Sequence, residues 1–192
     1  MTTLMAPTQA ELPSFIAALE RGWSPDTTRG ADAATEELAR LRADPARYLA
    51  LMTDREAAGG PVKLPDGSMV QRLPGLRRWI WDGEFCGSIG LRWQRGTPEL
   101  PSHTLGHIGY AVVPWKRQRG HATRALGLML AIARDEGLPW VTITTDADNA
   151  VSQRVIEANG GELVERFTKP AAFGGLPGLR YRVMLAGSHG SP

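Results

Sequence analysis

A short turn rich in nitrogen donors links an apolar run to a long amphipathic segment. It covers residues 117–123 and reads RQRGHAT. The amphipathic segment predicts a helix, whose N-terminus offers unpaired N–H groups and a partial positive charge. Arg117, Arg119 and these N–H groups would converge on one small volume, while Gly120 and Ala122 would let a ligand approach the backbone. The turn therefore predicts a site for a phosphate or pyrophosphate.

Other phosphate motifs do not occur in the chain. It contains neither G-x-x-x-x-G-K-[ST] nor G-x-G-x-x-G. The basic cluster between Lys116 and Arg124 is too short for a nucleic-acid footprint, but it is sufficient for one ligand with a few phosphates. A plainer interpretation stays open, in which Gly120 only permits a turn and the arginines are solvated.

Composition limits the class of protein. The 192 residues, 42% hydrophobic and 22% charged with a net charge of +2, are typical of one globular domain. No apolar run reaches the roughly 18 residues of a membrane span, and the N-terminal stretch lacks a signal-peptide pattern. A single cysteine, Cys86, excludes an intrachain disulfide and favours a buried thiol in a reducing compartment. We therefore expect a cytoplasmic protein that binds neither membrane nor nucleic acid.

The first half of the chain predicts helices and then a hairpin. Apolar spacing indicates helices over residues 9–21 and 31–54, the second divided at Pro45. The Gly/Pro-rich stretch 56–69 is expected to be a mobile loop. Asp-Gly between two apolar runs predicts a β-hairpin at residues 77–93.

The second half predicts alternating strands and helices. The clearest helix follows Gly120 and stops near Gly137. The other predicted elements are strands 107–113 and 140–145, a helix 150–159 capped by Asp148 or Asn149, and strands 162–167 and 179–185. This order predicts a mixed α/β sheet with a parallel crossover over residues 107–145.

Two segments carry a resemblance to a known family. The core of the basic turn, Arg117 to Ala122, is similar to the acetyl-CoA motif R/Q-x-x-G-x-G/A of the GNAT superfamily of N-acetyltransferases. The run TTDADNAVSQRVIEANGGEL, residues 144–163, resembles the strand and asparagine-led helix of the same family. The similarity covers roughly residues 70–185 and suggests a branch of predicted acetyltransferases of unassigned substrate.

The resemblance implies a fold and a division of the chain. A GNAT fold has a mixed, mostly antiparallel sheet with a central parallel strand pair, flanked by helices. Residues 1–60 would form N-terminal helices on the acceptor side of the same domain. Residues 61–186 would form the acetyl-CoA-binding core, and residues 187–192 a disordered tail.

The resemblance also implies how acetyl-CoA is held. The strand end at Val112 and Val113 would pair with the pantetheine arm. Backbone amides of the turn and the Arg117 side chain would cradle the pyrophosphate, and Lys116, Arg119 or Arg124 could reach the 3′-phosphate. Asn149 would bond the pantetheine or position its helix. The implied cofactor-binding residues are Val112, Val113, Arg117, Gln118, Arg119, Gly120, His121, Ala122, Thr123, Asn149 and Ser152.

The implied reaction moves an acetyl group from acetyl-CoA to a primary amine of a small molecule or peptide by direct attack, without a metal. The family usually places a tyrosine as general acid seven residues after the asparagine, but Ile156 stands there. Ser152, which could reach the thioester sulfur, and Tyr181 are the candidates for that role. A thiolate could also leave without a dedicated acid.

His107 is the first candidate for the base, because a histidine titrates near neutral pH. Asp146 is the second. Plainer interpretations stay open for both: a structural histidine bonded to backbone, and a loop cap. For the aromatic residues Trp79 and Trp81, core packing competes with an acceptor pocket that holds a cationic amine.

Two other functions remain open at this point. The chain could bind acyl-CoA without turnover, as a regulatory module, which the missing tyrosine would suit. It could instead transfer a different acyl group or acylate a hydroxyl. Exposed sheet edges make a homodimer possible.

Overall fold

The computed structural model describes residues 1–26, 29–64 and 66–185. Its elements in chain order are β1 (Thr3–Met5), α1 (Leu12–Glu20), α2 (Gly30–Ala43), α3 (Pro45–Ala50), β2 (Thr53–Asp54), β3 (Val62–Lys63), β4 (Met69–Val70), β5 (Gly75–Trp81), β6 (Phe85–Arg92), β7 (Ile108–Val112), the 3₁₀ turn η1 (Pro114–Lys116), α4 (His121–Asp135), β8 (Trp140–Asp146), α5 (Ala150–Glu157), β9 (Glu162–Thr168), η2 (Ala171–Phe173) and β10 (Pro177–Met184).

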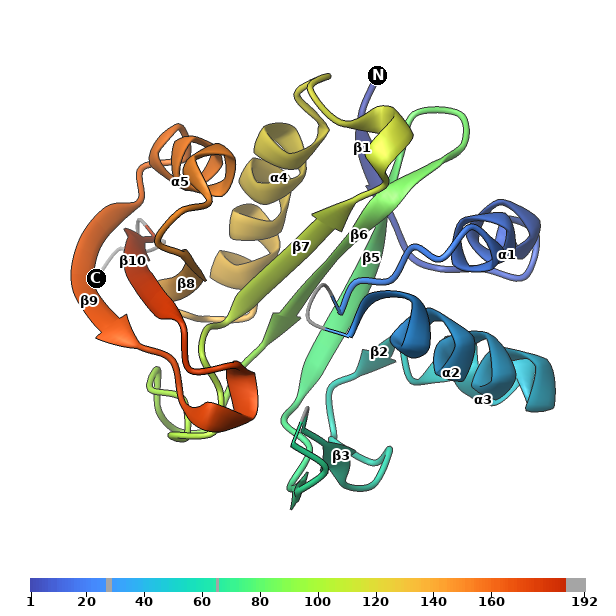
Figure 1. Cartoon of the computed structure of the whole chain (residues 1–192), viewed down its shortest axis with the longest axis horizontal. Helices are drawn as coiled ribbons and strands as arrows, with labels where there is room; N and C mark the ends of the chain where they lie inside the picture. The colour runs from blue at the N-terminus through green and yellow to red at the C-terminus, as the bar shows by residue number, and fades with distance from the viewer. Residues whose placement is uncertain (27–28, 65, 186–192) are drawn as a thin grey trace, which may run out of the picture.

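The described strands form a mixed sheet with the order β1-β5-β6-β7-β8-β10-β9, to which β2 adds beside β5 (Figure 1). All neighbours pair antiparallel except β7 and β8, which are parallel and joined by the α4 crossover. The predicted α/β class, the mostly antiparallel sheet and the parallel crossover are therefore confirmed.

Helix α4 forms where the sequence pattern placed it. Its buried residues Ala125, Leu126, Met129 and Ala133 repeat at helical spacing and face the sheet. Left-handed glycines, with φ 76° at Gly120 and φ 84° at Gly137, adjoin its two ends, because a glycine adopts this conformation with little strain.

Two hydrophobic clusters cover opposite faces of the sheet. Helices α4 and α5 pack on one face, against residues such as Ile80, Ile89 and Ile143. Helices α1, α2 and α3 pack on the other, around Phe15 and Trp79. Trp79 is fully buried within a group of aromatic rings, so core packing accounts for this tryptophan.

Strands β7 and β8 meet only where β7 begins, beside the middle of β8. Their register contains one pair, Ile108 with Ile143, next to the bond from the His107 N–H to the Thr142 carbonyl oxygen, 2.8 Å long. Within the described residues nothing pairs with the rest of β7 on its β8 side. Beyond Ile108 the two strands therefore leave a slot in the sheet.

Some parts of the chain differ from the sequence-based expectation. The short strand β1 was not predicted, although it pairs with β5. The stretch expected to be a loop contains the small hairpin β3–β4. Residues 187–192, the expected disordered tail, lie outside the described residues. Among the described helices, none combines the length and apolarity that crossing a membrane requires.

Candidate functional site

The slot between β7 and β8 exposes backbone groups. The Val113 N–H donates to the Cys86 carbonyl oxygen of β6 at 2.9 Å. Because N–H groups alternate along a strand, Tyr110 and Val112 direct theirs toward the slot. Val112 thus lies where an added strand would pair, whereas the N–H of buried Val113 is already bonded. The backbone N–H predicted to pair with the pantetheine arm is therefore open to the slot at Val112 and already occupied at Val113.

The basic turn presents a row of donors at the end of the slot. Gln118 and Gly120 both have positive φ, 61° and 76°. Such left-handed residues curve the backbone, so that successive N–H groups point to one side and form an anion-binding hollow. In the described chain, the N–H groups from Gln118 to Thr123 donate to no recorded acceptor, and the Arg124 N–H is the first to bond, to the Gly120 oxygen at 3.1 Å.

Three arginines surround this turn. Arg117, Arg119 and Arg124 are exposed, and the Arg117 Nε donates to the Val112 carbonyl oxygen at 3.3 Å. Arg119 and Arg124 line a cavity of about 320 Å³ beside the turn, and a second depression of about 550 Å³ runs from Gly120 along α4 to Asn159. The structure thus groups the arginines that the sequence placed together.

Lys116 does not belong to this free basic group. It is buried, and its ammonium pairs with Asp82 at 3.1 Å and with Glu84. The side-chain bond to Glu84 raises the pKa of Lys116. The prediction that this lysine could reach a 3′-phosphate is therefore wrong.

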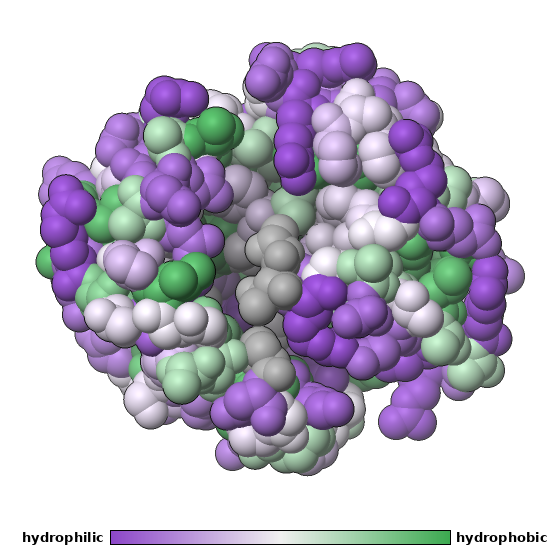
Figure 2. All heavy atoms as spheres, viewed as in Figure 1, coloured by the Kyte–Doolittle hydropathy of each residue, from purple (hydrophilic) through white to green (hydrophobic). Residues whose placement is uncertain are grey.

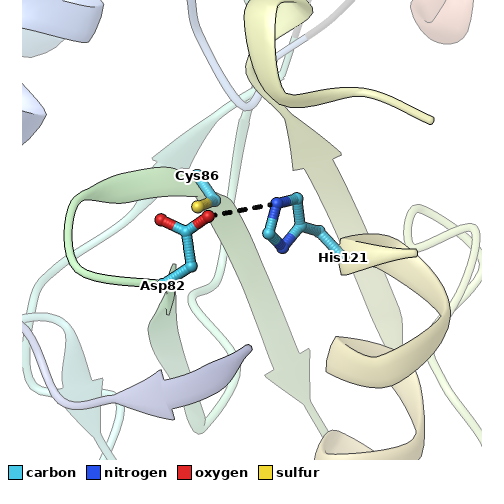
Figure 3. A group of neighbouring side chains, drawn as sticks. All are labelled: Asp82, Cys86 and His121. Atoms are coloured by element: carbon cyan, nitrogen blue, oxygen red, sulfur yellow. Dashed lines mark ion pairs between the residues drawn. The ribbon is translucent and has the colours of Figure 1, made fainter. Parts of the chain in front are cut away.

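His121 lies beneath the turn in a buried polar cluster with Asp82 and Cys86 (Figure 3). Its Nδ1 is 3.0 Å from the Thr2 hydroxyl, and its Nε2 is 3.5 Å from Asp82 Oδ2. Burial lowers the pKa of His121. Its side chain therefore supports the turn from inside, and only its backbone N–H is available to a phosphate.

The potential ligand atoms of Asp82, Cys86 and His121 lie within 4.8 Å of one another, as in many metal sites. However, the Lys116 ammonium lies 3.1 and 3.2 Å from the two Asp82 oxygens. The Cys86 thiol donates to the Glu84 carbonyl oxygen at 3.4 Å, and burial raises its pKa to about 12. We interpret the cluster as an ion-pair network that braces the turn against the β5–β6 hairpin.

Helix α5 and strand β7 bring two hydroxyl groups together beside the slot. The Asn149 Oδ1 accepts from the Ser152 N–H at 3.0 Å and so caps the helix. One turn into the helix, the Ser152 Oγ lies 2.9 Å from the Tyr110 hydroxyl of β7. Burial raises the pKa of Tyr110, and the bond to Ser152 opposes that rise. Tyr110 is therefore protonated at neutral pH and can donate a proton.

Sequence reasoning missed Tyr110 as a functional residue. It identified the tyrosine only as part of a strand face. The signal that could have pointed to it was a hydroxyl on the strand leading into the phosphate turn, opposite the helix that begins at Asn149.

Comparison with known families shows to which protein family the chain belongs. The model of the acetyltransferase (GNAT) domain matches residues 31–162, which is more than half of the chain. The chain belongs to the GNAT acetyltransferase family. A search of curated proteins found no match.

Solved structures share the fold of this GNAT acetyltransferase. One is the microcin self-immunity acetyltransferase MccE in complex with acetyl-CoA and AMP, 12% identical, with a TM-score of 0.58 over 95% of this chain and 92% of that one. Another is the ribosomal-protein alpha-N-acetyltransferase RimL in complex with CoA, 14% identical, with a TM-score of 0.62 over 96% and 94%. An acetyltransferase from Bordetella pertussis described as putative is 20% identical, with a TM-score of 0.56 over 94% of each chain.

His107 is a structural residue in this acetyltransferase. It is 1% exposed, its Nδ1 lies 3.0 Å from the Thr142 N–H nitrogen, and its Nε2 lies 3.0 Å from the Pro98 carbonyl oxygen. Burial lowers its pKa to about 4. Because both ring nitrogens are engaged away from solvent, the structure argues against the predicted base role.

Asp146 ends β8 beside the slot. Its side chain alternates with those of Val141 and Ile143, which point to the α4 face, so it points to the opposite face. Its carboxylate pairs with Lys169 and is 43% exposed. Asp146 thus remains a possible base, on the face away from Tyr110 and Ser152.

Two further residues bear on the general acid, namely Ile156 at the family's usual position and the candidate Tyr181. Both are buried. Ile156 is fully buried in the core on the α4 face. The Tyr181 hydroxyl donates to Glu157 Oε1 at 3.1 Å.

Proposed function

We propose that this GNAT protein transfers an acetyl group from acetyl-CoA to a primary amine of a small molecule or peptide. The observation that carries this proposal is the slot beyond Ile108, which leads from the hydroxyls of Tyr110 and Ser152 to the free N–H groups of the basic turn. A slender amide-containing arm suits the slot, and a pyrophosphate suits the donors. MccE and RimL, with bound acetyl-CoA and CoA, support the choice of co-substrate.

The turn also has room for a pyrophosphate. A Cβ placed on Gly120 would meet no atom of the described part of the chain within 4 Å, so the backbone there is open to a ligand. Arg117 and Arg119 are exposed beside it and would add charge-assisted hydrogen bonds. Asn149 would act by capping α5, which sets the position of Ser152.

The proposed reaction is a direct attack. The amine nitrogen bonds to the acetyl carbon, the carbon–sulfur bond breaks, and the amine loses one proton. Tyr110, linked to Ser152, donates a proton to the departing sulfur and is reprotonated from solvent. The chain's main contribution is to hold both reactants at the slot.

Asp146 is the proposed acceptor of the amine proton. It lies at the slot on the face opposite Tyr110, where an attacking amine would enter. An incoming ammonium would replace Lys169 as the partner of Asp146 and give it one proton before the attack. The neutral amine then loses its second proton to solvent as the amide forms.

A module that binds acyl-CoA without turnover is the competing interpretation, because Ile156 removes the usual acid. The hydroxyl pair of Tyr110 and Ser152 favours catalysis, since it supplies a donor from another element. Release of CoA in the presence of amines distinguishes the two functions.

The decisive experiment is calorimetric titration with acetyl-CoA and with CoA. Gly120→Glu places a bulky anion among the donors and strains a residue with φ 76°, so binding should be lost. Gly137→Glu makes the same change at φ 84° near the other end of α4 and controls for backbone strain and charge. Binding by wild type and Gly137→Glu alone supports the proposal. Tight binding by a folded Gly120→Glu variant, or no binding by wild type, refutes it.

A further inference from the structure

A bare patch of sheet lies beside the slot on the face away from α4. Arg77, Gly90 and Gly109 are aligned across three adjacent strands. Among the described residues, a Cβ on Gly90 would meet only the Leu76 carbonyl oxygen within 4 Å, at 3.6 Å. Gly109 directly precedes Tyr110 in β7. The patch therefore borders the slot, on the face of the sheet opposite the Tyr110 side chain. On this face β9 and β10 lie to one side and α1 and α2 to the other (Figure 1 and Figure 2).

Arg92 projects over this patch. It pairs with Gly75 in the β5–β6 register, which makes it the diagonal neighbour of Arg77 on the same face. Its Nη2 lies 3.6 Å from the position that a Cβ on Gly109 would occupy. Although Arg92 is exposed to solvent, surrounding protein atoms and the charge of Arg77 lower its pKa.

The two guanidinium groups differ in their partners. Arg77 Nη1 donates to Glu37 Oε1 at 2.7 Å, and the Tyr48 hydroxyl donates to the same oxygen. Glu37 is only 5% exposed, so Arg77 is fixed by a buried network. Across the described residues, no hydrogen bond or ion pair is recorded for the Arg92 side chain. Of these two neighbouring positive charges, only Arg77 therefore has a carboxylate partner among the described residues.

We propose that Arg92 binds a carboxylate of the acceptor, and that the substrate class is amines that carry a carboxylate, such as amino acids and short peptides. This inference rests on the proposed function. A guanidinium matches a carboxylate with two parallel hydrogen bonds, and an acceptor anion would relieve the repulsion from Arg77. The bare glycines leave space for the acceptor backbone between Arg92 and the slot.

The test compares amino acids and dipeptides with their C-terminal amides, using CoA release at saturating acetyl-CoA. Wild type should prefer the acids, with a KM at least about tenfold lower. Arg92→Gln should remove this preference by raising the KM for acids, and Arg92→Lys should restore part of it. Arg42→Gln is the control, because Arg42 pairs with Glu20 on the protein surface. A thermal-shift series with the same acids and amides in the presence of CoA measures binding without turnover.

Each outcome assigns the failure to one hypothesis. Acetyl transfer without an acid preference, or a preference that survives Arg92→Gln, overturns the acceptor inference and leaves the proposed function intact. Acetyl-CoA binding by wild type without transfer to any acid, and without an acid-dependent thermal shift, also overturns it. Absence of acetyl-CoA binding refutes the proposed function itself.

Discussion

At the scale of single residues, the proposed proton donor lies on a strand and not at the family's usual helical position. Ile156 is buried in the core, while the Tyr110 hydroxyl lies 2.9 Å from the Ser152 Oγ at the slot. Ser152 was predictable from its place after Asn149. Tyr110 was not, because its partner lies 42 residues away in sequence, and only the placement of α5 against α4 and β8 brings the two together.

Tyr110→Phe should therefore lower kcat about tenfold to hundredfold and leave acetyl-CoA affinity unchanged, since only the proton donor is lost. Ser152→Ala should have a similar effect, and the double variant should be little worse than either single one, because the hydroxyls act as a unit. Stopped assays of CoA release combined with calorimetry measure both quantities. Tyr181→Phe is the matched control, because that hydroxyl bonds Glu157. Equal kcat in Tyr110→Phe and wild type would remove this role.

The failed candidates show what a residue type cannot reveal. His107 suited a base by its chemistry alone, yet burial and two bonded ring nitrogens argue against that role. Lys116 belonged to a basic run in sequence, yet its side chain turns inward to Asp82. Both outcomes depend on the direction in which a side chain points. Residue spacing does not determine that direction where a strand or helix begins or ends.

At the scale of elements, the sequence pattern predicted secondary structure best in segments that have several repeats of apolar residues or a clear turn signal. The stripe on α4 and the Asp-Gly hairpin were predictable because local preference and burial agree there. The strand β1 has only three residues, too few for a pattern. The slot arises from the divergence of β7 and β8, a property of the whole sheet. The resemblance implied pantetheine pairing at this strand end, but Val113 is bonded to Cys86 and only Val112 faces the slot.

The contribution of the α5 N-cap to stability can be measured directly. The Asn149 Oδ1 accepts the Ser152 N–H at 3.0 Å, so Asn149→Ala should lower the free energy of unfolding by about 1 kcal/mol. Asn149→Asp, which keeps an acceptor oxygen, should lose less. Urea denaturation with an unchanged m-value would show that stability alone is affected. If the alanine variant is as stable as wild type, the cap does not stabilise α5.

At the scale of the whole molecule, the groups proposed to act on acetyl-CoA and on the acceptor lie on opposite faces of the sheet. Tyr110 and Ser152 lie toward α4 and α5, where the basic turn begins, and Arg92 and Asp146 lie on the opposite face. The slot connects them between β7 and β8. Two separate surfaces and one opening suit a direct transfer in which donor and acceptor enter from different sides.

The stability of the whole fold should depend on pH through His107, whose side chain bonds β8 to the loop before β7. Burial lowers its pKa to about 4, against about 6.5 for an exposed histidine. The unfolded chain therefore binds a proton as pH falls below about 6.5, while the folded chain does so only near its lowered value. This contribution is fully present above the unfolded pKa and is lost as pH falls toward 4, by up to about 3 kcal/mol.

His107→Gln isolates this effect, because Gln keeps an acceptor and a donor but does not titrate. Its free energy of unfolding should be lower than that of wild type at pH 7 and should fall less steeply between pH 6.5 and about 4. His121, whose pKa burial also lowers, and the carboxylates remain in both proteins, so their contributions cancel in the comparison. Urea denaturation at several pH values gives the two slopes. Parallel slopes would mean that His107 is protonated as readily in the folded protein as in the unfolded chain, contrary to its burial against β8.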